Sequence, residues 1–63
     1  MNIQAGKKYL VKMYVGRADK MTLEEVEVMD TSGFGIRAMR CKLLKTKQSY
    51  MIHEEHFIKE ILD

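Results

Sequence analysis

The sequence has no proline, no tryptophan and only one cysteine, and it lacks any long apolar run. Without a second cysteine, Cys41 cannot form an internal disulfide, so we expect the fold to depend on its hydrophobic core, which suits a reducing cytoplasm. No segment approaches the roughly 18 apolar residues that a membrane-spanning helix needs. The first residues also lack the basic segment and apolar core of a signal peptide. We therefore expect a cytoplasmic protein with no membrane contact.

The short length limits how much surface the chain can bury. Its 63 residues, 46% of them apolar and 32% charged, are typical of one globular domain, here residues 1–63, and exclude intrinsic disorder. A chain of this size buries only about 60% of the surface that its unfolded form exposes. Because its stability is then small, we expect a bound partner or a homodimer.

Charge is present in both signs and reverses along the chain. Residues 1–20 carry a net charge of +4, residues 21–35 carry −4, residues 36–50 carry +5 and residues 51–63 carry −3. The total of +2 and the isoelectric point of about 8.8 are modest for a nucleic-acid-binding protein. Such blocks can pair oppositely charged neighbouring strands, or they can separate a basic face from an acidic one.

The segment from Lys8 to Val15 alternates between apolar and polar residues. Tyr9, Val11, Met13 and Val15 point to one side, and Leu10 is the apolar exception on the other side. A period of two predicts a strand with one buried face. A glycine-led polar loop follows at residues 16–20, and a second polar turn is expected at residues 45–48.

Residues 21–30 fit both a helix and a strand. Thr22 to Glu25 has the form of a capping box, and Leu23, Val26 and Met29 recur at helical spacing. Residues 25–28 alternate instead, and valine favours strands. We predict a strand, because a glycine-bearing connection of hairpin type follows at residues 31–35.

A hairpin with Val28 opposite Ile36 makes sensible cross-strand pairs. In this register the apolar residues change face on both strands. Val26, Val28, Ile36 and Ala38 lie on one side, and Leu23, Met39, Cys41 and Leu43 lie on the other. A sharply bent hairpin that serves two packed layers would explain this change of face, and so would a sheet covered on its second face by a helix or a second subunit; we predict the bend.

The tail from residue 53 to residue 62 also has two interpretations. Phe57, Ile58, Ile61 and Leu62 form one face of a helix; alternatively, residues 53–56 make one helical turn and residues 57–62 form a last strand. We predict a mainly β fold of about five short antiparallel strands. It resembles the SH3-like small barrel in having five short strands with one helical turn before the last. The alternative is an α+β fold, an antiparallel sheet with a C-terminal helix.

No residue pattern indicates catalysis, so we do not expect an enzyme. Cys41 lies in an apolar stripe and is expected to be a small buried hydrophobe. His53 and His56 are three residues apart, but zinc needs three or four ligands and no spacing supplies them. We expect neither a metal nor another cofactor.

The basic strand from residue 37 to residue 47 is the strongest binding signal. Beside aromatic rings, such residues can hold phosphates and stacked bases. We predict nucleic-acid binding, and the candidate residues are Lys12, Tyr14, Arg37, Arg40, Lys42, Lys45 and Lys47.

Two other functions remain open. Phe34 lies between two glycines at the expected hairpin tip, where an exposed ring can enter a pocket of a partner protein. With the acidic residues 24–30 and the methionines, it makes a protein-binding adaptor or inhibitor the alternative. A small subunit of a larger assembly is the third possibility.

Overall fold

The computed structural model describes residues 2–14, 21–31 and 37–62, and it places most of them in strands. The elements are β1 (Lys8–Tyr14), β2 (Met21–Asp30), β3 (Ala38–Leu43), β4 (Ser49–His53), the 3₁₀ turn η1 (Glu54–His56) and β5 (Phe57–Glu60). Among the described residues no helix is long and apolar enough to cross a membrane.

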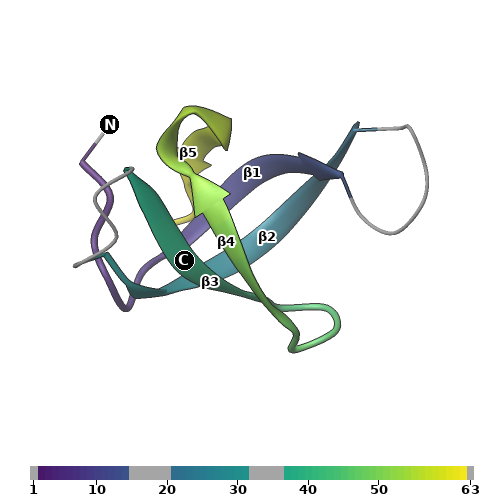
Figure 1. Ribbon diagram of the computed structural model, residues 1–63, viewed down its shortest axis with the longest axis horizontal. Coiled ribbons are helices and arrows are strands. Elements are labelled where there is room, and N and C mark those ends of the chain that lie inside the picture. The colour runs from purple at the N-terminus through teal and green to yellow at the C-terminus, as the bar shows by residue number, and fades with distance from the viewer. Residues whose placement is uncertain (1, 15–20, 32–36, 63) are drawn as a thin grey trace.

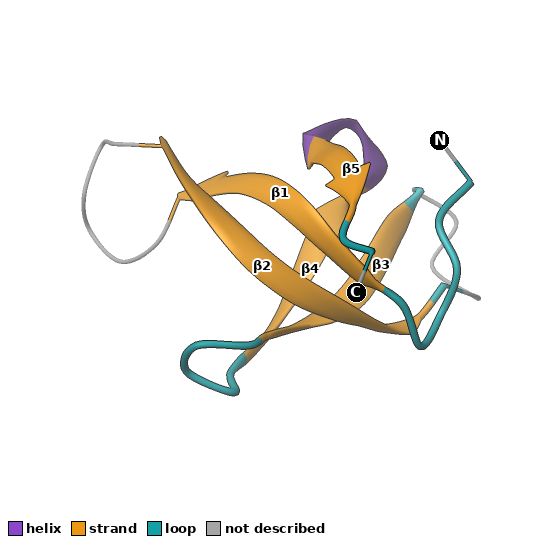
Figure 2. Ribbon diagram, turned by 180° about the vertical axis from the view of Figure 1, so that it is seen from behind, coloured by secondary structure: helices purple, strands orange, loops and turns teal. Residues whose placement is uncertain are grey.

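The five strands form one antiparallel sheet in the order β4-β3-β2-β1-β5 (Figure 1). The predicted mainly β class with five antiparallel strands is therefore confirmed. The sheet is open, with β4 and β5 as its two edges, so no pairing among the described residues closes it into a barrel. It curls strongly instead, and Figures 1 and 2 show the β3–β4 hairpin lying over the β1–β2 hairpin.

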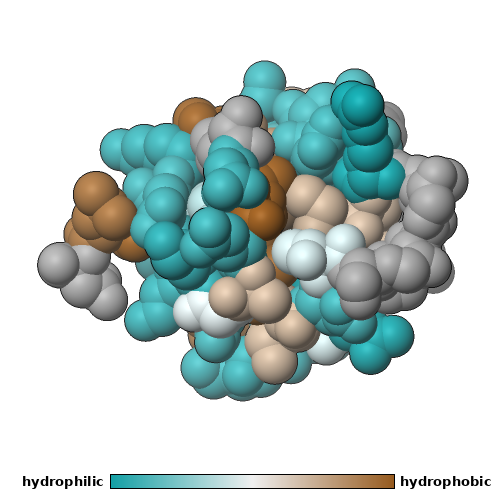
Figure 3. Space-filling model, turned by 90° about the vertical axis from the view of Figure 1, so that its left-hand side faces the viewer, coloured by the Kyte–Doolittle hydropathy of each residue, from teal (hydrophilic) through white to brown (hydrophobic). Residues whose placement is uncertain are grey.

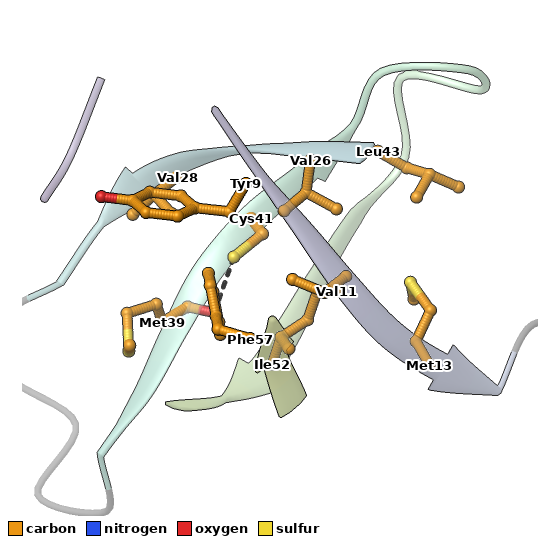
Figure 4. Packing of buried hydrophobic residues seen from close by; sticks show 10 residues of the cluster. All are labelled: Tyr9, Val11, Met13, Val26, Val28, Met39, Cys41, Leu43, Ile52 and Phe57. Carbon is orange, nitrogen blue, oxygen red and sulfur yellow. Dashed lines mark hydrogen bonds between the residues drawn. The ribbon is translucent and has the colours of Figure 1, made fainter. Parts of the chain in front are cut away.

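The alternation along β1 creates one side of the core. Tyr9 and Val11 are fully buried and Met13 is nearly so, as the period of two predicts, while Leu10 is only half-buried. Val15 lies outside the described residues. All five strands contribute to the core, and Figure 4 shows ten of its side chains pointing toward one another: Tyr9, Val11, Met13, Val26, Val28, Met39, Cys41, Leu43, Ile52 and Phe57.

Residues 21–30 form a strand, so the helical alternative is wrong. The first part of β2 pairs with β1, from Met21 opposite Tyr14 to Glu27 opposite Lys8. Its second part pairs with β3, and a bulge lies between Val28 and Asp30. Thr22 to Glu25 are therefore paired in the sheet and do not cap a helix, because the pairing of β2 with β1 and β3 outweighs a local helical preference.

The predicted register of the β2–β3 hairpin is wrong. Val28 lies opposite Cys41 rather than Ile36, and Val26 lies opposite Leu43. In the observed register Val26, Val28, Met39, Cys41 and Leu43 belong to one core cluster, so this apolar set does not change sides; Ala38, at the start of β3, is buried outside that cluster. Leu23, which was assigned to the face of Cys41, is 60% exposed.

The tail follows the second interpretation, and a C-terminal helix is wrong. The three residues of η1 precede β5, which is two residues shorter than predicted. The Nδ1 atom of His53 accepts a hydrogen bond of 3.3 Å from the backbone N–H of Glu55 and so caps the turn. β5 then pairs with β1, with Phe57 opposite Val11.

Backbone hydrogen bonds fix two short segments outside the strands, the turn between β3 and β4 and the segment before β1. The predicted polar turn between β3 and β4 is present, and the Lys47 N–H donates to the Leu43 carbonyl at 2.8 Å. Before β1, the Gly6 N–H donates to the Val28 carbonyl, also at 2.8 Å. Gly6 has φ +87°, a conformation that an L side chain disfavours, so this connection needs glycine.

Candidate binding site

β3 places two of the predicted basic residues on the outer face of the sheet. Met39, Cys41 and Leu43 point into the core, so Arg40 and Lys42 between them point outward. Arg40 is exposed and Lys42 is half-buried. Lys45 and Lys47 follow as exposed residues in the turn to β4. The structure therefore brings four of the predicted residues onto one strand and its turn.

The sheet register sets acidic residues beside this basic strand. Asp30 of β2 lies opposite Arg40, and Glu27 lies opposite Lys42. On its other side, Glu27 lies opposite Lys8 of β1. At these three positions β2 sets an acidic residue opposite a basic residue of β1 or β3, which stabilises the cross-strand pairs.

The other predicted residues lie away from these four. Arg37 precedes β3 at the end farthest from the turn, and its guanidinium is 3.2 Å from the Glu54 carboxylate. Lys12 belongs to β1, which β2 separates from β3. Tyr14 pairs with Met21, but its side chain is outside the described part of the structure. Phe34 also lies outside the described residues, so its exposure stays a prediction.

The edge formed by β4 is a feature that the sequence reasoning missed. β4 pairs with β3 on one side, and no described strand pairs with its other side. Its five residues, Ser49–His53, include no lysine, arginine, aspartate, glutamate or proline. Natural sheets protect their edges with such residues, or with bulges, against pairing with another chain. The opposite edge has this protection, because β5 contains Lys59 and Glu60 and a bulge interrupts its ladder with β1.

A hollow of about 330 Å³ runs along β4. Tyr50 and Ile52 line it from the buried side of the strand, and Met51 lines it with a side chain that is 48% exposed. The hydroxyl of Tyr50 donates a 2.7 Å hydrogen bond to the Gln48 side-chain carbonyl at the exposed surface. The other lining residues are Lys12, Met13, His53 and His56. The hollow combines apolar walls with cationic or neutral polar groups.

The sequence contains the signal for this edge. The run Ser49–His53 is the longest strand segment without a lysine, arginine, aspartate or glutamate, and its three middle residues are all apolar. Only the strand order, however, shows that this segment lies at an edge rather than in the middle of the sheet.

Two further hollows lie elsewhere on the surface. One of about 430 Å³ is lined by Leu10, Leu23 and Leu44 with Glu24, Glu25 and Lys45. Another, of about 410 Å³, lies between Ile3, Arg37 and the η1 region. Figure 3 shows that the side of the molecule at the left of Figure 1 is mixed, with hydrophilic residues around apolar ones near the centre of the view. None of these surfaces combines an apolar hollow with an unpaired strand edge.

Cys41 is fully buried, as predicted. Its thiol donates to the Met39 carbonyl at 3.6 Å, the contact drawn in Figure 4. Burial raises the pKa of Cys41 from 9.0 to about 11. Since the thiolate is the reactive form, this environment suppresses nucleophilic chemistry. Among the residues that the structure describes, no three His, Cys, Asp or Glu side chains are grouped closely enough to hold a metal ion.

Comparison with known proteins finds no relative: no family model, no curated protein and no solved structure matches this chain.

Proposed function

We propose that this protein is a small non-enzymatic protein-binding module that accepts an extended segment of a partner at the free edge of β4. An edge strand offers unpaired backbone N–H and C=O groups, and an added strand satisfies them while pockets beside the edge select its side chains. The observation that carries the proposal is the unprotected, uncharged edge of β4 with an apolar hollow beside it.

We also propose a fold type and a cellular compartment for this protein. The sheet order and the helical turn before β5 support an SH3-like small barrel whose last pairing is open. An added strand would lie where such a barrel closes. The single cysteine, buried as a thiol, supports a reducing, cytoplasmic location.

The test is a pulldown from native lysate with three immobilised forms of the protein. Met51→Lys places an ammonium group at the middle of the β4 edge, where an added strand would have to desolvate it. Ile58→Lys places the same group on β5, at a side chain of similar exposure, 39% against 48%. A partner that binds the wild type and Ile58→Lys but not Met51→Lys supports the proposal. Equal capture by all three forms would overturn it.

Nucleic-acid binding is the second candidate. Its support is the series of Arg40, Lys42, Lys45 and Lys47 along one strand and the following turn. Affinity for an oligonucleotide should then fall steeply with salt, because bound phosphates release counterions. Arg40→Glu with Lys42→Glu should abolish this binding. Lys7→Glu with Lys59→Glu, which changes the net charge equally, should retain most of it. An absence of gel retardation at low salt would end this hypothesis.

A further inference from the structure

β4 is complementary to itself. When two antiparallel copies of Ser49–His53 are centred on Met51, Met51 lies opposite Met51, Tyr50 opposite Ile52, and Ser49 opposite His53. Every apolar residue meets an apolar residue, and the two polar residues meet each other. We propose that the segment added to β4 is the β4 strand of a second copy of this chain, in a symmetric dimer. This inference rests on the proposed function of β4 as a strand-accepting edge.

The alternation of β4 restricts the register of such a dimer. Tyr50 and Ile52 belong to the core side, whereas Met51 belongs to the outer side. A shift of one residue would join the buried face of one copy to the outer face of the other. Centring on Tyr50 sets Gln48 opposite Ile52 and Lys47 opposite His53. Centring on Ile52 sets Tyr50 opposite Glu54. Only the register centred on Met51 avoids these mismatches.

Charges beyond the strand favour the same register. Lys47 lies in the turn just before β4 and Glu55 lies in η1 just after it, so the two-fold axis brings the Lys47 end of each copy to the Glu55 end of the other, twice. Both residues are exposed, and the Glu55 side chain is 72% exposed. In its own chain the Glu55 carboxylate lies 3.9 Å from the imidazole of the neighbouring His56. The flanks of β4 therefore complement each other in sign.

The hollow beside β4 gives this pairing its apolar contacts. Tyr50, Ile52 and Met51 line it, and in the dimer each Tyr50 faces the Ile52 of the second copy on the core side. The two cores then extend across the axis, and the two exposed Met51 side chains cover each other on the outer side. A chain of this size has little core of its own, so shared apolar area has a large effect on its stability.

The test measures molecular mass by sedimentation equilibrium over a wide range of protein concentration. We expect a mass near 7.4 kDa at high dilution and about twice that value when the protein is concentrated. Met51→Lys should be monomeric throughout, because two ammonium groups would meet at the axis. Ile58→Lys, on the other edge, should dimerise like the wild type.

A charge exchange tests the register. Lys47→Glu alone and Glu55→Lys alone should each weaken the dimer by about tenfold, since each replaces two attractive pairs by repulsive ones. The double variant restores both attractive pairs and should recover most of this loss. If a single variant were weak because it misfolded, the second substitution would not rescue it.

The mass measurement and the pulldown together distinguish the symmetric dimer from the more general strand-accepting edge of β4. A wild type that stays monomeric, or a dimer that Met51→Lys leaves intact, overturns the second copy as occupant. If the protein is monomeric but loses another partner with Met51→Lys, the strand-accepting edge stands and only the self-association fails. If Met51→Lys changes neither the mass nor any capture, both are wrong.

Discussion

Tyr9 of β1 and Phe57 of β5 meet edge to face, with ring centroids 5.4 Å apart and planes inclined by 73°. Aromatic pairs prefer this geometry because the positive ring edge faces the negative ring face. Phe57 comes directly after η1, so the contact fixes the end of the helical turn and the start of the last strand on β1. It is the point at which the C-terminal segment joins the core.

Tyr9→Phe should keep this ring contact and lose one hydrogen bond. The Tyr9 hydroxyl accepts from the Gln4 N–H at 2.9 Å in a partly buried position. Without that acceptor, we expect the free energy of unfolding to fall by about 1 kcal/mol. Tyr50→Phe is the control, because its hydroxyl bond is exposed and water replaces it. Urea unfolding measures both, and equal losses would contradict the role of the Gln4 contact.

Val28→Ala and Met29→Ala test which face of β2 is buried. Val28 is fully buried and Met29 is 47% exposed, although the two are neighbours in sequence. We expect Val28→Ala to cost about 2–3 kcal/mol through lost burial and a cavity. Met29→Ala should stay within about 0.5 kcal/mol. Thermal unfolding ranks the two variants, and the reverse order would contradict the observed register of β2.

Gly6→Ala should destabilise the connection before β1. Gly6 has φ +87°, and no atom lies within 4 Å of the position that a Cβ would take. The expected cost of about 1–2 kcal/mol therefore comes from the backbone conformation and not from crowding. D-alanine favours positive φ, so placing it at position 6 by chemical synthesis should preserve the stability. A loss of the same size with both isomers would indicate steric conflict instead.

Stability should fall at alkaline pH through Cys41. Burial raises the pKa of this thiol from 9.0 to about 11, so the folded protein keeps a proton that the unfolded chain releases. The stabilisation that this raised pKa provides is complete below pH 9. It is lost as the pH rises toward 11, and the free energy of unfolding then falls by up to about 3 kcal/mol.

Cys41→Ala removes this titration and is the control for all other groups that ionise in the same range. Urea unfolding at a series of pH values should give a steeper decline for the wild type than for Cys41→Ala between pH 9 and 11. Parallel declines would contradict the burial of the thiol.

Local patterns in the sequence predicted most of the elements. The alternation of Tyr9, Val11 and Met13 indicated β1, and the polar residues 45–48 indicated the turn before β4. The choice of a helical turn followed by a strand was one of two predictions for the tail, and packing of Phe57 on Tyr9 decides it. A helix over the same residues has an equally consistent apolar face, so periodicity alone does not separate the two.

The predicted hairpin register failed because it assumed a short connection. Val28 opposite Ile36 gives good local pairs, and so does Val28 opposite Cys41. Local pairs do not distinguish these registers. The observed one buries Cys41 and Leu43 beside Val26, against β1, which is remote in sequence, and against Ile52 of β4.

The sequence by itself determined the alternation of β1, the polar turn before β4 and the succession of charge blocks, because these depend on neighbouring residues. The tertiary structure decided which strands became edges and which charges became neighbours. Strand order sets Glu27 between Lys8 and Lys42, so a predicted basic face became a mixed one. Among the described strands, the same order left the uncharged β4 without a second neighbour, since pairing across the sheet depends on how the whole chain folds back on itself.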